Sequence, residues 1–367
     1  MRSGDEASTT PGTSPAVSVV MTALEESRYL GDAVASVFAQ DYDGPLELVV
    51  AVGPSKDNTE ELAQQLAARY GDRMRVHKNP TGRTPAGLNI AIAGTDPTTS
   101  IIVRTDGHAN LPPDYVRTAV ELLTSTGAAN VGGMMVPDGH TPFEQAVARG
   151  MSERIGLGSA SFHVGGEAGP ALTVYLGVFR RDVLARLGGF NETFTRAQDW
   201  ELNYRIRELG ELVYFDPRLQ VHYRPRPNVR GLSKQFRGSG AWRWQIIRTY
   251  PGTASLRYLA APAAVLGIAA SVLAAVAGAA SQSVPVLVGS AVLPAGYLLV
   301  VTAGAALTRR GLSAKASALY PGVLVAMHMS WGSGFLTAAA KDAWSALRAP
   351  ARRRSVPATN PRADRIA

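Results

Sequence analysis

The sequence predicts an α/β fold with a mainly parallel sheet, followed by transmembrane helices. The first observation is a regular alternation of short apolar runs and helical patterns between Val17 and Ser125, which is typical of a parallel sheet. The second is a pair of uncharged runs, Leu259–Ala280 and Val286–Leu307. Each is long enough to cross a bilayer, which takes about 20 apolar residues. A buried hairpin of a soluble protein is the alternative, but two adjacent uncharged runs of this length are rare in soluble cores.

The charges divide the chain into two parts. Its 367 residues carry a net charge of +8. Residues 1–216 hold 18 basic and 27 acidic residues, whereas residues 217–341 hold 13 basic residues and no acidic one. The chain has no cysteine, which excludes disulfides, thiolate metal sites and cysteine nucleophiles. An acidic half is therefore followed by a basic half that contains the apolar runs.

The elements of the acidic half follow one another in a strand–helix order. The predicted strands are Val17–Met21, Leu46–Val52, Met74–His77 and Ile101–Thr105. The spacing of apolar residues predicts helices over Glu26–Ala39, Glu60–Tyr70, Thr84–Ala93 and Tyr115–Ser125. In parallel sheets of this kind, ligands bind beyond the carboxyl ends of the strands. We therefore expect the functional site at that edge.

Asp106 and His108 follow the fourth predicted strand, in the stretch Arg104–Asn110. A spacing of two residues on an extended turn points both side chains the same way. Carboxylate and imidazole groups bind divalent ions such as Mn²⁺ or Mg²⁺, and an ion there could bridge the two phosphates of a nucleotide. Taken alone, the residues favour an ordinary Asp–Gly turn beside a surface histidine. Their place at a strand end favours the metal site.

A second group of polar residues opens a helix predicted from Gln198 to Leu209. Asp199 lies in its first turn, where the helix dipole favours an ionised carboxylate, and such a group can take a proton from a hydroxyl. A plain acidic first turn is the structural alternative. Glu201 faces away from Asp199 by helical angle, which indicates a supporting or packing role. The glycine turn Gly188–Glu192 precedes this helix.

Together these motifs resemble the inverting family-2 glycosyltransferases, and most of all their ExoA-like branch from succinoglycan biosynthesis. Members have the GT-A fold, a Rossmann-like nucleotide-sugar-binding domain. The resemblance covers about residues 16–225. The segments that carry it are Val17–Glu26, Ser55–Thr59, Gly82–Asn89, Arg104–Ala109, Gly188–Phe190 and Asp199–Arg205. In the family these are the first nucleotide-binding strand, the exit of the second strand, the donor loop, the metal motif and the acceptor side with the catalytic base.

The resemblance implies a role for each matching residue. It implies Asp199 as the catalytic base, and Asp106 with His108 as ligands of Mn²⁺ or Mg²⁺. The acceptor side would be Gly189, Trp200 and Glu201. The donor-binding residues would be Thr22, Ala23, Glu25, Gly53, Ser55, Asp57, Arg83, Asn89, Arg104 and Asp106.

Two arginines and a histidine have both a functional and a structural interpretation. The guanidinium of Arg83 suits phosphate oxygens, but it is equally a solvated loop side chain. Arg104 can orient Asp106 or form a purely structural salt bridge. His222, after a predicted strand Leu212–Phe215, is either a further metal ligand or a surface histidine, and the second reading is favoured.

The chain departs from the family pattern at several positions. Members usually have proline and asparagine where Thr22 and Glu25 stand, and often an aspartate that contacts uracil where Gly53 stands. The resemblance implies a UDP-sugar as the favoured donor, and these departures leave a GDP-sugar open. His108 replaces the second aspartate of the metal motif, and Gln198 stands where many members carry an acid. No Gln-x-x-Arg-Trp motif follows, which implies single sugar additions rather than processive synthesis.

The segment 226–258 is predicted to form an amphipathic helix on an anionic membrane surface. Phe236, Gly240, Trp244 and Ile247 fall on one helical face, with basic residues on the other. Nucleic acid is the alternative partner of a basic stretch. The adjoining apolar runs favour lipid, and no nucleic acid is expected.

These patterns divide the chain into five parts. They are a disordered leader at 1–14, a cytoplasmic catalytic domain at 15–225, the amphipathic segment at 226–258, a membrane region at 259–340 and a basic tail at 341–367. The leader lacks the apolar core of a secretory signal. The sequence therefore predicts a multi-pass protein of the inner (cytoplasmic) membrane whose catalytic domain lies in the cytoplasm.

The basic loops set the expected orientation of the spans. The loop that contains Arg309 and Arg310 is predicted to be cytoplasmic, as is the basic tail. The third uncharged run, Ala318–Ala340, contains Pro321 and several glycines. It is predicted to be re-entrant or interfacial, because a third full span would place the basic tail outside. Three full spans are the alternative.

The resemblance implies a membrane-anchored inverting enzyme that moves one sugar from a nucleotide sugar to a lipid-linked saccharide in exopolysaccharide or cell-envelope synthesis. Two alternatives stay open. One is transfer to a polyprenyl phosphate, an acceptor that is already ionised, for which Asp199 matters little. The other is an inactive nucleotide-sugar-binding scaffold of a polysaccharide export complex. The departures at Glu25 and Gly53 favour the scaffold, and the presence of Asp106 and Asp199 disfavours it.

Overall fold

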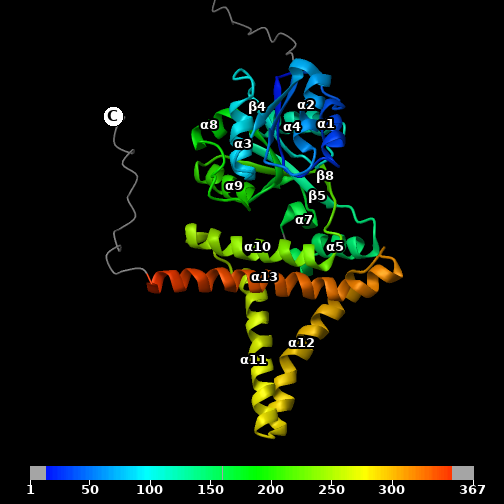
Figure 1. The fold of residues 1–367 in the computed structure, drawn as a ribbon, viewed down its shortest axis with the longest axis vertical. Coiled ribbons are helices and arrows are strands. Elements are labelled where there is room, and N and C mark those ends of the chain that lie inside the picture. The colour runs from blue at the N-terminus through cyan, green and yellow to red at the C-terminus, as the bar shows by residue number, and fades with distance from the viewer. Residues whose placement is uncertain (1–13, 159, 349–367) are drawn as a thin grey trace, which may run out of the picture.

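The computed structural model describes residues 14–158 and 160–348. The predicted leader, except for its last residue, and the tail beyond residue 348 lie outside the described residues. An eight-stranded sheet with the order β3-β2-β1-β4-β7-β5-β8-β6 forms the centre of the acidic half. Figure 1 shows this sheet domain on one side of a pair of long helices, α10 and α13, and a helical hairpin on the other side.

The first half of the sheet is parallel, as predicted. Its strands are β1 (Val17–Ala23), β2 (Leu46–Val52), β3 (Met74–Lys78) and β4 (Ile101–Asp106). The helices between and after them are α1 (Leu30–Phe38), α2 (Thr59–Tyr70), α3 (Thr84–Ala93) and α4 (Tyr115–Thr126). Alternate residues of β1 pack on opposite faces: Val19 and Met21 join one core cluster, and Val20 joins the other. Both faces are therefore covered, which explains why these strands are continuously apolar.

The second half of the sheet is mixed, and the sequence did not predict it. β7 runs antiparallel to β4 and β5, β8 runs parallel to β5, and β6 is antiparallel to β8. The strands are β5 (Asn130–Pro137), β6 (Gly169–Pro170), β7 (Tyr175–Arg180) and β8 (Val213–Tyr223). The prediction of a short strand ending at Phe215 was wrong, because β8 continues to Tyr223 and contains His222 as an exposed residue. The helices of this half are α5 (Pro142–Ser152), α6 (Arg154–Leu157), α7 (Ser161–Val164), α8 (Arg181–Leu187) and α9 (Gln198–Glu208).

Four long helices follow the sheet domain. They are α10 (Val229–Thr249), α11 (Ala260–Ala280), α12 (Val284–Thr308) and α13 (Ala314–Arg348). The helices α11, α12 and α13 are each long and apolar enough to cross a membrane, by length and composition. Only 6% of the apolar window is buried in each of the first two, against 39% in α13. In Figure 1, α11 and α12 form a hairpin that points away from the sheet domain, while α13 runs across its base.

The helix predicted within 226–258 is present as α10, but its apolar face is not free. Phe236 packs in a cluster with residues of α5 and α13, and Trp244 meets Phe335 edge-on at 5.4 Å. A Cβ atom at Gly240 would overlap the carbonyl oxygen of Trp331. The prediction that this face lies on lipid was therefore wrong, because α13 covers it. The third apolar segment, predicted to be re-entrant or interfacial, lies within one helix, α13, that continues through Pro321.

Candidate active site

Arg104 joins the end of β4 to the first turn of α9. Its side chain is almost fully buried, its Nη2 lies 2.9 Å from Asp106 Oδ1, and its Nη1 donates to Asp199 Oδ2. The parallel register sets Thr22 of β1 directly beside Asp106. The sequence singled out these residues in separate motifs. The structure brings them together at the carboxyl edge of the sheet.

The charges of this group influence one another. Burial alone would lower the pKa of Arg104, but the carboxylates of Asp106 and Asp199 raise it, so the guanidinium stays charged. Burial raises the pKa of Asp199; Asp106 adds to this rise and Arg104 opposes it. Burial likewise raises the pKa of Tyr175, at the start of β7, well above its usual value. An aspartate whose pKa is raised is a stronger general base at neutral pH.

One carboxylate oxygen of Asp199 has no partner among the described residues. Its Oδ2 is held by Arg104, while its Oδ1 is buried and has no hydrogen-bond partner among the described residues. An unpaired buried carboxylate oxygen is costly, and such atoms often mark the place of a ligand or water. The residue before α9, Ala197, has a left-handed φ of 56°. That strained turn aims the first turn of α9, and hence Asp199, at the sheet edge.

His108 is fixed by Glu26. Its Nδ1 lies 2.7 Å from Glu26 Oε1. Burial would lower the pKa of His108, but the hydrogen bond with Glu26 and the charge of Asp106 outweigh it, and the pKa is raised. A histidine that binds a metal usually has its other ring nitrogen held by a carboxylate in this way. The arrangement leaves Nε2 as the nitrogen that can bind an ion.

Asp106 and His108 fit an open metal site. Within residues 14–158 and 160–348, no three His, Asp or Glu side chains come together to enclose a metal. Mg²⁺ is usually held by one or two carboxylates, waters and substrate phosphates rather than by a full protein cage. The Oδ1 atom of Asp106 accepts from Arg104, which leaves Oδ2 for an ion. The residues present therefore suit an ion that a diphosphate helps to bind.

Hydrogen bonds join the exits of β1 and β2 on the predicted donor side. The Glu25 amide donates to Ser55 Oγ at 3.1 Å, and the Lys56 amide donates to Glu25 Oε1 at 2.7 Å. Glu25 has a left-handed φ of 58°, a conformation in which asparagine is favoured over glutamate. The two hydrogen bonds hold Glu25 in this conformation. The structure thus gives Glu25 and Ser55 a clear role in loop shape.

Asp57 organises the same loop. It accepts from the Ser27 amide at 3.1 Å and from the Thr59 amide at 3.2 Å. Hydrogen bonds from Thr59 and Ser27 lower the pKa of Asp57 to about 2. These contacts keep the stretch before Leu30 out of a helix. The predicted helix start at Glu26 was therefore wrong by one turn.

The remaining donor-side residues line the same edge. A Cβ atom at Gly53 would lie 3.0 Å from Leu24 Cδ1 and 3.2 Å from Gly82 Cα, so position 53 has little room for a larger side chain. Ala23 ends β1 as a buried residue. Arg83 is exposed beside Gly82. Its side chain is therefore open to solvent, where it can reach a phosphate.

Asn89 connects the donor loop to the acceptor side. Its Nδ2 donates to the Phe190 carbonyl at 2.9 Å, and its Oδ1 accepts from the Phe190 amide at 2.8 Å. Gly189 has a φ of +76°, and a Cβ atom there would lie 2.5 Å from Asn89 Oδ1. Asn89 was predicted to bind the donor, but its hydrogen bonds go to the loop on the acceptor side.

Glu201 anchors α9. Its side chain is fully buried, both of its oxygens lie 2.8 Å from Arg205 nitrogens, and the Tyr250 hydroxyl donates to Oε1 at 2.7 Å. Trp200 stacks on Tyr204 with ring centroids 5.6 Å apart. These contacts fix α9 against the end of α10. Glu201 therefore supports the position of Asp199 from the far side of the helix.

Sequence reasoning missed three residues near this edge. Tyr175 lies at the start of a strand that was not predicted. Arg196 and Arg226 lie in loops before α9 and α10, next to the motifs that were singled out. The acid-free composition of residues 217–341 was a usable signal for Arg226, because an arginine in such a stretch has few possible partners.

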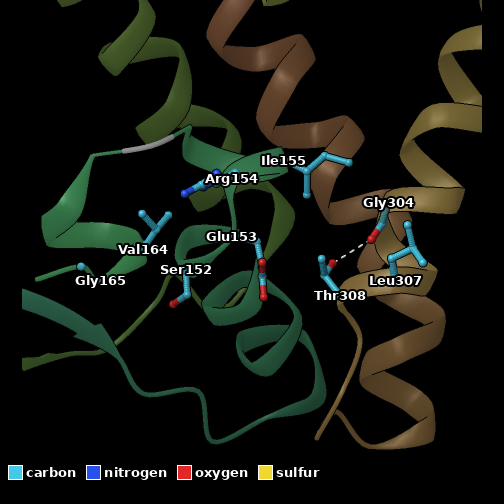
Figure 2. Close-up of a pocket in the computed structure, with 10 residues that line it drawn as sticks. Ser152, Glu153, Arg154, Ile155, Val164, Gly165, Gly304, Leu307 and Thr308 are labelled. Atoms are coloured by element: carbon cyan, nitrogen blue, oxygen red, sulfur yellow. Dashed lines mark hydrogen bonds between the residues drawn. The ribbon is translucent and has the colours of Figure 1, made fainter.

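A cavity of about 630 Å³ lies away from this edge, where α6 and α7 meet the C-terminal end of α12. Figure 2 shows Ile155 and Val164 on the sheet-domain side, and Leu307 and Thr308 on α12. None of the predicted site residues lines it. The cavity is therefore separate from the carboxyl-edge site.

The fold and the carboxyl-edge site define a GT-A glycosyltransferase. The chain belongs to the glycosyltransferase-like family 2, whose model matches residues 15–243. It is 28% identical over 288 residues to the succinoglycan biosynthesis protein ExoA of Rhizobium meliloti (strain 1021), an alignment that covers 78% of this chain and 84% of ExoA. The predicted family, its ExoA-like branch and the fold class are confirmed.

Two further comparisons are informative. The putative glycosyltransferase EpsE of Bacillus subtilis (strain 168) is 35% identical over 94 residues, which is 25% of this chain and 33% of EpsE. Among solved structures, the mannosyltransferase PcManGT from Pyrobaculum calidifontis, in complex with GDP-Man and Mn²⁺, has a TM-score of 0.60 and 21% identity, covering 91% of this chain and 89% of PcManGT. At that identity the likeness supports the fold.

Proposed function

We propose that this glycosyltransferase moves one sugar from a nucleotide sugar to a lipid-linked saccharide in exopolysaccharide or cell-envelope synthesis, with Mn²⁺ or Mg²⁺ and with inversion at the anomeric carbon. The observation that carries the proposal is the bridge that Arg104 makes between Asp106 and Asp199. Asp106, the candidate metal ligand, and Asp199, the candidate base, therefore bind the two terminal nitrogens of one rigid guanidinium group. The relationship to ExoA supports the class of pathway.

In this proposal each residue has a defined task. Asp106 and His108 would hold the divalent ion, which would neutralise the diphosphate of the donor. Asp199 Oδ1 accepts the proton of the acceptor hydroxyl. The hydroxyl oxygen then bonds to the anomeric carbon as the bond from that carbon to the nucleoside diphosphate breaks on the opposite face. Arg104 keeps both carboxylates in place throughout. Its hydrogen bond to Asp199 Oδ2 keeps that oxygen unprotonated, so the proton goes to Oδ1.

The donor stays a UDP-sugar by preference, with a GDP-sugar as the alternative. The family resemblance supports UDP, while the tight packing at Gly53 leaves little room for an aspartate contact to uracil. The GDP-Man and Mn²⁺ in the PcManGT structure are a reason to test both nucleotides. A thermal-shift screen of UDP- and GDP-sugars with each ion would choose between them. Stabilisation by none of them would count against the whole proposal.

The Asp199→Asn variant tests the reaction. Removing a general base slows turnover by about 10²–10⁴-fold, and we expect that loss in full-length protein in nanodiscs with a labelled donor. Asp182→Asn is the matched control, because Asp182 is an exposed acid in the first turn of α8. Near-normal turnover of Asp199→Asn would favour a polyprenyl phosphate acceptor instead. The scaffold alternative would be eliminated by metal-dependent transfer or hydrolysis with any nucleotide sugar.

The membrane arrangement forms part of the proposal. We infer that α11 and α12 span the inner membrane and that α13 lies along its cytoplasmic surface. Tyr320, Leu324 and Met327 of α13 share a core cluster with residues of α5 and α10. A spanning α13 would draw those helices, with exposed side chains such as Lys234, into the bilayer core, which is costly for a charge. The sheet domain and the end of α13 then lie in the cytoplasm.

Single-cysteine labelling tests this topology, because the chain has no native cysteine. We expect Ser345→Cys, near the end of α13, to react only from the cytoplasmic side. Gln282→Cys, at the turn between α11 and α12, is the matched position and should react only from the outside. Reaction of Ser345→Cys from the outside alone would overturn the interfacial placement and support three spans.

A further inference from the structure

Arg196 and Arg226 form a cationic pair between the catalytic edge and α10. Arg196 lies in the loop before α9, three residues ahead of Asp199, and Arg226 lies between β8 and α10. The positive charge of Arg226 adds to the burial that lowers the pKa of Arg196. Both side chains lie against α10: Arg226 donates to Gln235, and Arg196 lies at Gly238, three residues further along. Residues three apart share one face of a helix, so the two arginines are neighbours on α10.

Arg196 lies directly on the backbone of α10. A Cβ atom at Gly238 would come 3.2 Å from Arg196 Nε and 3.3 Å from its Cζ. Glycine is unfavourable inside a helix, and here it allows the guanidinium to lie close to the helix axis. The loop is held down by Phe194, whose ring lies 5.9 Å from that of Trp242 on α10. The position of Arg196 is thus built into the packing.

Arg226 is held by an uncharged side chain. Its Nε donates to Gln235 Oε1 at 3.2 Å, and the Tyr223 hydroxyl donates to the same oxygen at 3.4 Å. The amide of Gln235 orients the guanidinium. It supplies no negative charge.

The pair has no counter-charge of its own. The nearby Arg224 and Arg205 pair with Glu144 and Glu201 at 3.2 and 2.8 Å. Within the part of the chain that the structure describes, neither Arg196 nor Arg226 has a carboxylate within 4.0 Å. Two neighbouring positive charges repel each other unless an anion lies between them. Planar guanidinium groups fit phosphate oxygens especially well.

We propose that Arg196 and Arg226 bind the phosphate or diphosphate that joins the acceptor sugar to its lipid. This inference rests on the proposed function, because it presumes a lipid-linked acceptor. It is favoured over the donor diphosphate because Arg196 lies on α10, the helix between the sheet edge and the membrane hairpin. An anion held there places its sugar toward Asp199, three residues away, and its lipid chain toward the hairpin.

Farnesyl diphosphate is the probe, and farnesol is its uncharged counterpart. Binding to the full chain in phosphatidylcholine nanodiscs is measured for wild type, Arg196→Gln and Arg226→Gln. Loss of a charge-assisted contact should weaken farnesyl diphosphate binding by about tenfold or more in each variant, with farnesol unaffected. Arg230→Gln removes an exposed arginine at the start of α10 and should bind farnesyl diphosphate as wild type does. Arg196→Lys and Arg226→Lys keep the charge and should recover part of the affinity, and melting curves confirm that each variant is folded.

Three results would overturn the inference. They are no binding of farnesyl diphosphate by wild type, equal binding by the glutamine variants, and a loss of affinity for the donor nucleotide sugar instead of the probe. The last result would assign the pair to the departing diphosphate. Binding of the donor nucleotide sugar with Mn²⁺, measured in the same nanodiscs, distinguishes a failure of this inference from a failure of the proposed function. If the donor binds and the probe does not, glycosyl transfer stands and only the acceptor site fails.

Discussion

Replacing Arg104 with glutamine should move the acid limb of the pH–rate profile to higher pH. Arg104 donates to Asp199 Oδ2 and lowers the pKa of that carboxyl, whereas burial and the charge of Asp106 raise it. A hydrogen bond from a charged group contributes about 1.5–3 kcal/mol, and one pKa unit corresponds to about 1.4 kcal/mol. Removing the guanidinium should therefore destabilise the ionised form of Asp199 by about 1.5–3 kcal/mol and raise its pKa further.

The sign follows from the role of Asp199 as a base. It acts only when ionised, so turnover falls as the pH drops through its raised pKa. A further rise of that pKa makes the fall begin at higher pH. In the variant, the contribution of Asp199 to stability is fully present below the ordinary pKa of an aspartate and is lost as the pH rises through the raised value. Breaking a buried ion pair costs about 3–5 kcal/mol, so folding is checked by thermal unfolding.

The assay is kcat/KM for sugar transfer, measured across the pH range at a fixed saturating concentration of Mn²⁺. The matched control is Arg180→Gln, which removes an arginine at the far end of β7 that pairs with Asp182 at 2.7 Å. The control should keep the wild-type profile. An acid limb that stays in place in Arg104→Gln, or moves to lower pH, would refute the reasoning.

Two pairs of glycine substitutions, each a test and its control, probe the packing of the protein by thermal unfolding of the full chain. Gly189→Ala should lower the melting temperature, because the new Cβ would lie 2.5 Å from a side-chain oxygen of α3 and the backbone has a φ of +76°. Gly188→Ala, with a φ of +70° but open space around its Cβ, should lower it less, and equal losses would contradict the contact. Gly240→Ala should cost about 1–3 kcal/mol, because its Cβ would overlap a carbonyl oxygen of α13. Gly322→Ala, in open space on α13, should cost nothing, and an equal effect of both would argue against the close helix contact.

Periodicity predicted the parallel half of the sheet well. β2 and α3 match the predicted Leu46–Val52 and Thr84–Ala93 to the residue, because continuous apolar runs and capping residues are local features. The insertion of the antiparallel β7 between β4 and β5 is a choice of partner between distant segments, and no local pattern encodes it. The bridge from Arg104 to Asp199 could not be predicted for the same reason. Arg104, Asp106 and Asp199 were each singled out separately, and only the fold shows that both carboxylates bind the guanidinium of Arg104.

The amphipathic pattern of α10 shows a similar limit. Apolar spacing indicates that one face of a helix is buried, but it does not say what buries it. Lipid was the expected cover, and α13, much later in the chain, proved to be the cover. The sequence did hold a usable signal: Gly238 and Gly240 lie inside a predicted helix, where glycine often marks the close approach of another group. Arg196 approaches the first glycine, and Trp331 approaches the second.

Residues 217–341 contain no acidic residue, so adding one beside Arg226 is the sharpest test of the cationic pair. Gln235→Glu keeps the shape of the side chain that holds Arg226 and adds the missing negative charge. The new salt bridge should raise the free energy of unfolding by about 0.2–1 kcal/mol. It should also compete with a phosphate for the same guanidinium and weaken farnesyl diphosphate binding by about tenfold. A more stable protein that binds the probe less well is the signature of a charge left unpaired for a ligand; unchanged binding in a stabilised variant would show that Arg226 is not part of a phosphate site.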